Sequence, residues 1–330
     1  MLNGVESGEA LLDIKDLSVS FDVYGKKSHV LDEVSFRVGK GERVGLVGES
    51  GCGKTTTLKS ILRVLPKNAV VAGGEISFEG RDVFNMSETD LNGMRRTGAG
   101  MIFQDPSSAL NPVFSIESQF LTAIKYANPG ASKKELHATA IEALNGVMLP
   151  DPDRIMKSYP YQLSGGMKQR VCIAVTIAAG RRLMLADEPG TSLDVTIQDQ
   201  ILRLINQLVI DKGLSVIMVS HSLGVIREST SLVNIMYAGT VVESGATEDV
   251  FELPMHPYTK ALMSCVPKLT GGSISRGIPG RPPDYSRPPA GCRFEPRCPS
   301  SGDVCRAKKP PRLEASPGHF VSCFFAEGAA

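Results

Sequence analysis

A glycine-rich segment followed by a lysine and threonines is the first feature of the sequence that could do chemistry. A short apolar run, residues 44–47, leads into Gly48-x-x-x-x-Gly53-Lys54-Thr55, and helix-forming residues follow. Glycines let backbone N–H groups turn inward around a triphosphate, and the N-terminus of the next helix adds partial positive charge. The Lys54 ammonium can reach the β- and γ-phosphates, and the Thr55 hydroxyl can bind Mg²⁺. The pattern predicts a phosphate-binding loop made of Gly48, Glu49, Ser50, Gly51, Cys52, Gly53, Lys54, Thr55 and Thr56.

Two carboxylates end a second apolar run. Residues 183–186 are apolar, and Asp187, Glu188 and a proline follow them. A buried parallel strand delivers the side chains at its end to the edge of the sheet where ligands bind. There, Asp187 suits Mg²⁺ through its water shell, and Glu188 suits the orientation or deprotonation of an attacking water. An isolated Asp-Glu pair is more often a strand ended by solvated acids, but its place downstream of a phosphate loop favours the catalytic interpretation.

Gln104 and His221 each end a further apolar run. Residues 101–103 lead into Gln104, and Pro106 then stops regular structure; residues 214–220 lead into His221. Among the five histidines, only His221 is expected at a strand end on the ligand edge. The others, predicted to have surface or structural roles, are His29, His137, His256 and His319.

A Ser-Gly-Gly sequence precedes a predicted helix that runs through residue 179. Ser164, Gly165 and Gly166 would again present free N–H groups at a helix start, which suits an anion. Such a tripeptide is common in loops and is a weak signal alone. Further on, Ser192-Leu-Asp194 forms a predicted turn before a helix over residues 195–208.

The elements that position these residues follow from hydrophobic periodicity. Residues 12–21 and 30–38 alternate apolar and polar side chains around a Gly25-Lys26-Lys27 turn, and residues 73–80 form another strand bounded by glycines. Tyr24 at the turn either stacks on adenine through its ring or is an ordinary turn tyrosine. Residues 107–161 are helical in pattern, with a capping box from Ser132 to Glu135. This segment is expected to form a helical lobe between two halves of an α/β core.

Composition limits the possible classes of protein. The 330 residues allow one large domain or two smaller ones, and a net charge of +1 does not favour nucleic-acid binding through a global basic field. The first ten residues lack a signal-peptide pattern, and no apolar run approaches the roughly 20 residues of a membrane span. We therefore expect a cytoplasmic protein, in which seven cysteines argue against a disulfide framework.

A proline-rich segment after residue 267 leads into a tail that holds four of the cysteines, Cys292, Cys298, Cys305 and Cys323. Four thiolates suit a [4Fe–4S] cluster or a structural zinc, or the cysteines simply pack. The spacings are longer than in zinc ribbons, which counts mildly against zinc. The basic residues around them are expected, by default, to form a solvated surface; they are Arg293, Arg297, Arg306, Lys308 and Lys309.

In this order and spacing, the motifs from about residue 11 to residue 267 resemble those of an ATP-binding cassette (ABC) transporter ATPase. Gly48 to Thr55 resembles its phosphate loop, Gln104 its Q-loop glutamine, and residues 163–169 its signature sequence. The acid pair at Asp187 resembles its catalytic strand end, residues 192–194 its D-loop and His221 its switch histidine. The resemblance implies an α/β phosphate-loop NTPase core with an antiparallel β subdomain and an inserted helical subdomain, plus a small Cys-rich C-terminal extension. The expected domains are an ATPase domain over 1–267, with the helical subdomain at about 107–161, and a linker and tail over 268–330.

The family also implies how the residues act. Two ATPase subunits dimerise head to tail, so that Ser164, Gly165 and Gly166 of one, with Asp194 in its D-loop, close over ATP held by the other. Thr55, Gln104 and Asp187 would hold Mg²⁺. The expected catalytic residues are Glu188, His221, Lys54 and Gln104.

A narrower resemblance is to the oligopeptide/dipeptide importer subfamily, and to the first of its paired ATPase subunits. The subfamily resemblance depends on residues 161–170, 236–239 and 256–259 and on the cysteine tail, and residues 149–152 favour the first of the paired subunits. It implies peptide uptake with a second ATPase subunit, two membrane permeases and a solute-binding protein, at the cytoplasmic face of the cell membrane. Relatives also serve nickel and oligosaccharide importers, so those cargoes stay open. Some dipeptide-importer ATPases carry an iron–sulfur cluster on such a tail, which favours a cluster over zinc.

Two other classes of function compete with transport. A soluble ABC protein acting on DNA or ribosomes often has two cassettes or long coiled coils, whereas this sequence has one cassette, no heptads and no basic stripe. A small-molecule kinase would share the phosphate loop but would leave the signature residues 163–169 unexplained.

Overall fold

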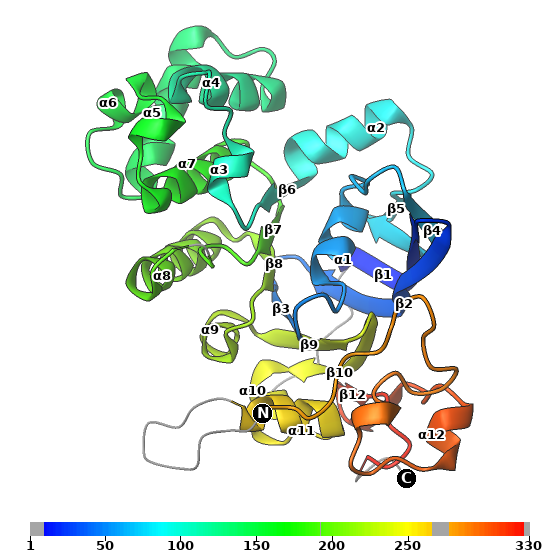
Figure 1. The fold of residues 1–330 in the computed structure, drawn as a ribbon. Coiled ribbons are helices and arrows are strands. Elements are labelled where there is room, and N and C mark those ends of the chain that lie inside the picture. Colours follow the sequence, from blue (N-terminus) through cyan, green and yellow to red (C-terminus); the bar gives the residue numbers. More distant parts are fainter. Residues whose placement is uncertain (1–9, 192, 266–276, 327–330) are drawn as a thin grey trace. The chain divides into compact units, whose positions relative to one another are not determined.

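The computed structural model describes residues 10–191, 193–265 and 277–326 of the chain. Its ribbon (Figure 1) comprises two compact units, described here one at a time. The first unit combines Met1–Asn85 with Ser220–Ala330, and the second is Met86–Val219. Ser192 of the predicted D-loop, the N-terminal residues 1–9 and the loop residues 266–276 lie outside the described residues.

An antiparallel sheet of four strands begins the first unit, in the order β2-β1-β4-β5. Its strands are β1 (Ala10–Val23), β2 (Lys26–Gly39), β4 (Ala69–Phe78) and β5 (Arg81–Asp82). The alternating residues Leu12, Ile14 and Leu17 are buried, as the period of two predicts. Tyr24 and Gly25 join β1 to β2 with φ of 49° and 75°, the left-handed pair that a two-residue hairpin turn requires. The predicted strands over 12–21, 30–38 and 73–80 are confirmed.

A second sheet in the first unit carries the phosphate loop. Its strands lie in the order β11-β12-β10-β9-β3, and β3 runs parallel to β9 with Val44 opposite Leu232. Their bounds are β3 (Arg43–Val47), β9 (Leu232–Tyr237), β10 (Thr240–Ala246), β11 (Leu313–Ser316) and β12 (His319–Val321). Because β12 pairs with β10, the C-terminal tail (described from 277 to 326) contributes strands to this sheet.

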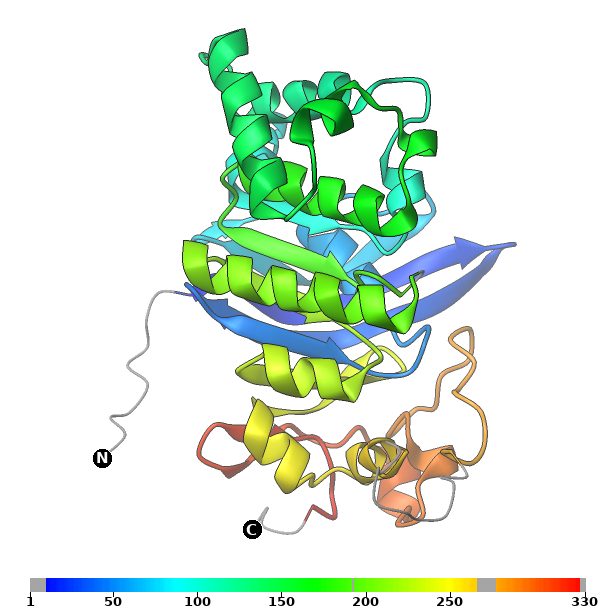
Figure 2. The ribbon, with the colours of Figure 1, turned by 90° about the vertical axis from the view of Figure 1, so that its left-hand side faces the viewer.

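Six short helical segments complete the described part of the first unit. They are α1 (Lys54–Ile61), α9 (Leu223–Ser229), α10 (Thr247–Glu252), α11 (Pro257–Ser264), the 3₁₀ turn η3 (Glu295–Arg297) and α12 (Asp303–Ala307). Figures 1 and 2 both place the tail, in orange and red, beside α11 in yellow. Phe294 of the tail lies within 5.8 Å of the His256 ring at the start of α11, ring centre to ring centre.

The second unit contains a parallel sheet in the order β8-β7-β6. The strands are β6 (Ala99–Ile102), β7 (Leu183–Asp187) and β8 (Ser215–Val219). Every residue of β7 and β8 is buried, which is why both read in the sequence as continuous apolar runs.

Helices make up the rest of the second unit. They are α2 (Glu88–Gly93), the π-helical η1 (Met94–Gly98), α3 (Pro106–Ala109), α4 (Ile116–Ala127), α5 (Lys133–Gly146), α6 (Pro152–Lys157), the 3₁₀ turn η2 (Pro160–Gln162), α7 (Gly165–Ala178) and α8 (Val195–Lys212). Figure 2 shows α3 to α7, in green, as one cluster. The predicted capping box is confirmed, because Ser132 and Glu135 exchange both hydrogen bonds at the start of α5. The helix predicted over 195–208 extends to Lys212, where Gly213 adopts the left-handed cap.

Membrane-spanning helices are not found in the described ranges, since no helix there has both the length and the hydropathy to cross a bilayer.

Candidate nucleotide-binding site

The phosphate loop connects β3 to α1 in the first unit, as the sequence predicts. Gly51 and Gly53 have φ of 80° and 105°, a backbone region that L side chains rarely adopt. Gly48 leaves no room for a side chain, because a Cβ there would collide with the carbonyl oxygen of Met236 and the Cys52 sulfur. The glycines therefore let the chain turn tightly between the strand and the helix.

Lys54 lies inside this loop. Its side chain is 5% exposed, and its Nζ donates hydrogen bonds to the carbonyl oxygens of Gly48 at 2.7 Å and Glu49 at 3.1 Å. Burial raises the pKa of the neighbouring Cys52 thiol, although the Lys54 charge opposes this shift. The loop thus holds one cation against its own carbonyl oxygens, next to the N-terminus of α1.

The acid pair lies at the end of β7, in the second unit. Asp187 is buried, and Glu188 has a left-handed φ of 45°, with its backbone N–H donating to the Val219 oxygen at 3.0 Å. The Gln104 Nε2 donates to the Glu188 Oε2 at 3.1 Å. Two residues that the sequence assigns separately, Gln104 and Glu188, are therefore in direct contact. A left-handed φ at a non-glycine residue is unusual and concentrates at functional sites.

His221 and Tyr24 are both exposed. His221 follows β8 by two residues, so its predicted position after a strand is confirmed. The Tyr24 ring extends fully into solvent at the β1–β2 turn, where it is accessible to a planar ligand.

The Ser-Gly-Gly sequence begins α7, as predicted. Ser164 caps this 14-residue helix, with its hydroxyl accepting from the Met167 N–H at 3.3 Å. Both glycines are closely packed, because a Cβ on Gly165 would lie 2.8 Å from Leu193 and one on Gly166 would lie 2.8 Å from Ile197. Nearby, Asp194 caps α8 through the Ile197 N–H at 2.9 Å. The first turn of α7 is thus packed against the chain around the start of α8.

The four tail cysteines line one cavity. Cys292, Cys298, Cys305 and Cys323 surround it together with Phe294, and all seven cysteines of the chain are free thiols. Burial raises the pKa of Cys292 to about 11. Within the described ranges, however, no three His, Cys, Asp or Glu side chains are placed to share one metal ion.

Arg293 and Arg297 correct the expectation of a solvated basic surface around the cysteines. Their side chains are 5% and 4% exposed, and they form ion pairs with Asp32 at 3.4 Å and Glu49 at 2.8 Å. Glu49 belongs to the phosphate loop, 248 residues from Arg297 along the chain. The sequence patterns do not predict this contact, because nothing in the sequence around Arg297 or Glu49 indicates that the two residues meet.

The sequence matches two family models. Residues 31–191 match the model described as ABC transporter, and residues 242–305 match the model described as oligopeptide/dipeptide transporter, C-terminal region.

Curated relatives match over nearly their full length. A probable peptide ABC transporter ATP-binding protein of Sinorhizobium fredii is 44% identical, with 96% of this chain and 95% of the relative covered. The dipeptide transport ATP-binding protein DppD of Bacillus subtilis is 40% identical, with 98% and 96% covered. The oligopeptide transport ATP-binding protein OppD of Escherichia coli is 38% identical, with 97% and 94% covered.

Solved structures agree with the fold. The ATP-binding cassette MJ0796, in a dimeric post-hydrolysis state bound to ADP and phosphate, has a TM-score of 0.64 at 26% identity, over 72% of this chain and 98% of that one. The cbiO1 protein from Clostridium perfringens, with a TM-score of 0.63 at 22% identity over 74% and 92%, supports the fold alone.

Proposed function

The chain belongs to the ABC transporter ATPase family, and on this premise we propose that it is the ATP-hydrolysing subunit of a membrane importer for peptides. One observation carries the cargo class: residues 242–305 match the C-terminal region of oligopeptide/dipeptide transporters. The ATPase does not itself contact the cargo in this scheme. It supplies the free energy of ATP binding and hydrolysis to the transport cycle.

ATP and Mg²⁺ are the ligands of the proposed reaction. The loop from Gly48 to Thr56 binds the phosphates, with the Lys54 ammonium on the β- and γ-phosphates. Thr55, Asp187 and Gln104 hold Mg²⁺ directly or through its water shell, which neutralises the charge that develops on the phosphates. Tyr24 stacks on adenine. The chemistry of these groups fits a bound magnesium nucleotide: a hydroxyl and a carboxylate are hard oxygen ligands, and the loop presents a cation.

Glu188 orients and polarises the attacking water, and His221 stabilises the γ-phosphate in the transition state. The contact between Gln104 and the Glu188 carboxylate supports this role, because it fixes the carboxylate at the strand end. The left-handed backbone of Glu188 supports it too.

The site is completed by a second subunit in this proposal. ATP held by a homologous ATPase is covered by four residues of this chain: Ser164, Gly165, Gly166 and Asp194. The homologous ATPase covers the ATP of this chain with its corresponding residues. The capped start of α7 offers N–H groups to an anion. The solved dimer of MJ0796 supports pairing of such subunits. We propose two permeases and a solute-binding protein as the remaining partners, with this chain at the cytoplasmic face of the cell membrane.

Glu188→Gln tests the catalytic assignment. The substitution keeps the shape of the side chain but removes the carboxylate, so the ATPase rate should fall by at least about 10²-fold while ATP binding persists. Hydrolysis is measured as phosphate release by the assembled transporter, and dimer trapping by size-exclusion chromatography with ATP. Glu142→Gln, at an exposed site on α5, is the matched control and should keep the full rate. An undiminished rate in Glu188→Gln would refute the assignment.

We also propose that Cys292, Cys298, Cys305 and Cys323 hold a [4Fe–4S] cluster. Three of the sulfurs accept backbone N–H groups, those of Phe294, Ser300 and Phe325, as cluster thiolates do. The four sulfurs line one cavity, yet no three of these side chains are placed to share one ion. This arrangement suits a cluster better than a zinc, because each cluster thiolate binds a different iron. A bound cluster would tie together a tail with little core of its own.

Metal analysis of anaerobically purified protein tests the cluster. We expect iron and acid-labile sulfide, with a broad visible absorption, and loss of both in Cys298→Ser. Cys265→Ser is the matched control, because Cys265 lies outside the tail cavity. The cluster proposal would be refuted by stoichiometric zinc, or by the absence of metal in protein kept anaerobic throughout.

A further inference from the structure

An arginine of the tail, Arg297, binds the side chain of Glu49 in the phosphate loop. Arg297 binds the Glu49 carboxylate in a two-pronged contact, Nη1 to Oε2 at 2.8 Å and Nη2 to Oε1 at 3.1 Å. Both side chains are largely buried, at 4% and 26% exposed. The geometry is the paired guanidinium–carboxylate arrangement, whose charge-assisted hydrogen bonds are among the strongest in proteins. The hydrogen bonds to Glu49 raise the pKa of Arg297, so the guanidinium stays charged.

The guanidinium itself is fixed by the tail. Its Nε donates to the Pro279 oxygen at 2.8 Å and its Nη2 donates to the Ile278 oxygen at 3.0 Å. Its Nη1 donates to the Tyr237 hydroxyl at 3.3 Å, at the end of β9. Arg297 therefore cannot move without loss of several contacts. Its guanidinium is already oriented for the bidentate contact with Glu49.

Two tyrosines hold the backbone of the same loop. The Tyr285 hydroxyl donates to the carbonyl oxygen of Gly51 at 2.8 Å, and the Tyr258 hydroxyl accepts from the Glu49 N–H at 3.0 Å. Phe294 of the tail packs against both Tyr237 and Tyr258, with ring centres 5.0 and 5.5 Å away. The loop is thus held at the Glu49 side chain and at the backbone of Glu49 and Gly51. The residues that hold it come after the ATPase motifs in the sequence.

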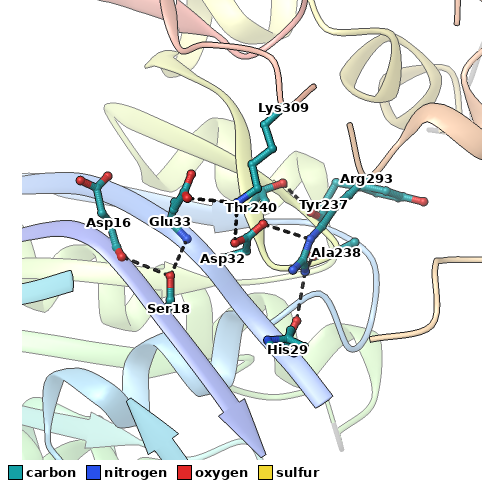
Figure 3. Close-up of polar contacts among 10 residues, drawn as sticks. All are labelled: Asp16, Ser18, His29, Asp32, Glu33, Tyr237, Ala238, Thr240, Arg293 and Lys309. Atoms are coloured by element: carbon teal, nitrogen blue, oxygen red, sulfur yellow. Dashed lines mark hydrogen bonds and ion pairs between the residues drawn. The ribbon is translucent and has the colours of Figure 1, made fainter. Parts of the chain in front are cut away.

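A second group of contacts anchors the tail beside the loop (Figure 3). Arg293 donates to the carbonyl oxygens of His29 and Ala238 and pairs with Asp32. Lys309 bonds Asp32 at 2.8 Å and Glu33 at 3.0 Å. The turn after Ala238 returns to the loop, since the Gly239 N–H donates to the Cys52 oxygen at 2.9 Å. These contacts fix the position from which Arg297 and Tyr285 act.

We infer that Arg297 and Tyr285 are positioning residues for the phosphate loop, so that the tail maintains the loop in the conformation that binds ATP. The inference rests on the proposed function, because it concerns the same nucleotide site. Two physical effects follow from the contacts. The loop backbone is held at Glu49 and Gly51, and the Glu49 carboxylate is neutralised by Arg297 instead of repelling the phosphates.

Nucleotide affinity of the full-length chain is the test. Arg297→Gln leaves Glu49 charged beside the phosphates and releases the loop, so the Kd for ATP, measured by titration calorimetry, should rise about tenfold. Addition of Glu49→Gln to this variant should recover part of the affinity, because it removes the unpaired charge. Tyr285→Phe removes only a hydroxyl and should weaken binding by a smaller factor, about threefold, without a change in fold.

Arg306→Gln is the matched control within the same tail. Arg306 pairs with Glu295 at 2.9 Å and with Asp303, and both of these partners lie in the tail, so ATP affinity should stay at the wild-type value. Circular dichroism and the iron content of the tail are measured in parallel. The inference is overturned if Arg297→Gln and Tyr285→Phe bind ATP like the wild type, or if Arg306→Gln is equally weakened. Failure of the wild type and Arg306→Gln to bind ATP would refute the proposed function instead.

Discussion

Acid should destabilise this protein through one buried histidine, His256. Its side chain is 2% exposed at the start of α11, and its Nδ1 accepts a hydrogen bond from the Tyr258 N–H at 3.0 Å. Burial lowers the pKa of His256 from 6.5 to about 4, against an opposing effect of the Glu243 charge. The imidazole is therefore neutral in the folded protein, and its protonation costs both desolvation and the hydrogen bond to Tyr258.

The direction and size of the effect follow from linkage. Between pH 6.5 and pH 4 the unfolded chain binds a proton at this histidine and the folded chain does not, so stability falls as pH falls. With these two pKa values, the free energy of unfolding should drop by about 2 kcal/mol between pH 7 and pH 5. Glu243 acts at lower pH. Burial alone would raise its pKa, but hydrogen bonds, the largest from His319, outweigh burial and lower it, so its contribution is lost only below about pH 4.5.

His256→Asn isolates this contribution. Asparagine does not titrate, and its side-chain oxygen can still accept a hydrogen bond at a helix cap. Urea unfolding followed by circular dichroism at pH 7 and pH 5 gives the loss of stability for each protein. We expect the wild type to lose about 2 kcal/mol more than the variant over this interval. Equal losses in the two proteins would show that His256 is not held neutral by burial, and the reasoning would fail.

Two further substitutions test the tail and the loop. Phe294→Ala removes a side chain that is 1% exposed and packs on Tyr237, Tyr258 and His256. It should weaken tail docking by about 3–5 kcal/mol and speed thiol labelling of Cys305 and Cys323 in the cluster-free protein, whereas Phe114→Ala, at an exposed site in the second unit, should not. Unchanged labelling in Phe294→Ala would contradict the packing argument. Gly48→Ala places a Cβ against the Met236 oxygen and should abolish ATP binding in calorimetry, while Gly146→Ala, with open space around it, should bind normally. Wild-type affinity in Gly48→Ala would show that the loop tolerates a side chain there.

Local features of the structure could be predicted from the sequence because their causes are local. The phosphate loop follows from glycines that permit a positive φ, directly after an apolar strand. The start of α5 follows from a capping box within four residues, and the buried strands β7 and β8 follow from continuous apolar runs. The family follows from several such local motifs in one order.

Contacts between distant residues could not be predicted, because a side chain carries no signal of a partner far away in sequence. Gln104 and Glu188 were each assigned to the site, but only the fold of the second unit brings them to 3.1 Å. The sequence predicts either a surface or a structural role for His256, and only the fold shows that it is buried beside Tyr258.

The sequence by itself determined that this chain has a phosphate loop, a signature sequence and four cysteines in a tail. Only the tertiary structure decided that the tail contacts the loop. Arg297 and Glu49 are 248 residues apart, and the sequence favours a solvated surface for an arginine between charged and cysteine residues. Its burial arises because the 3₁₀ turn η3 and the strand β12 place the tail beside the phosphate loop, where the partly buried Glu49 carboxylate accepts its hydrogen bonds.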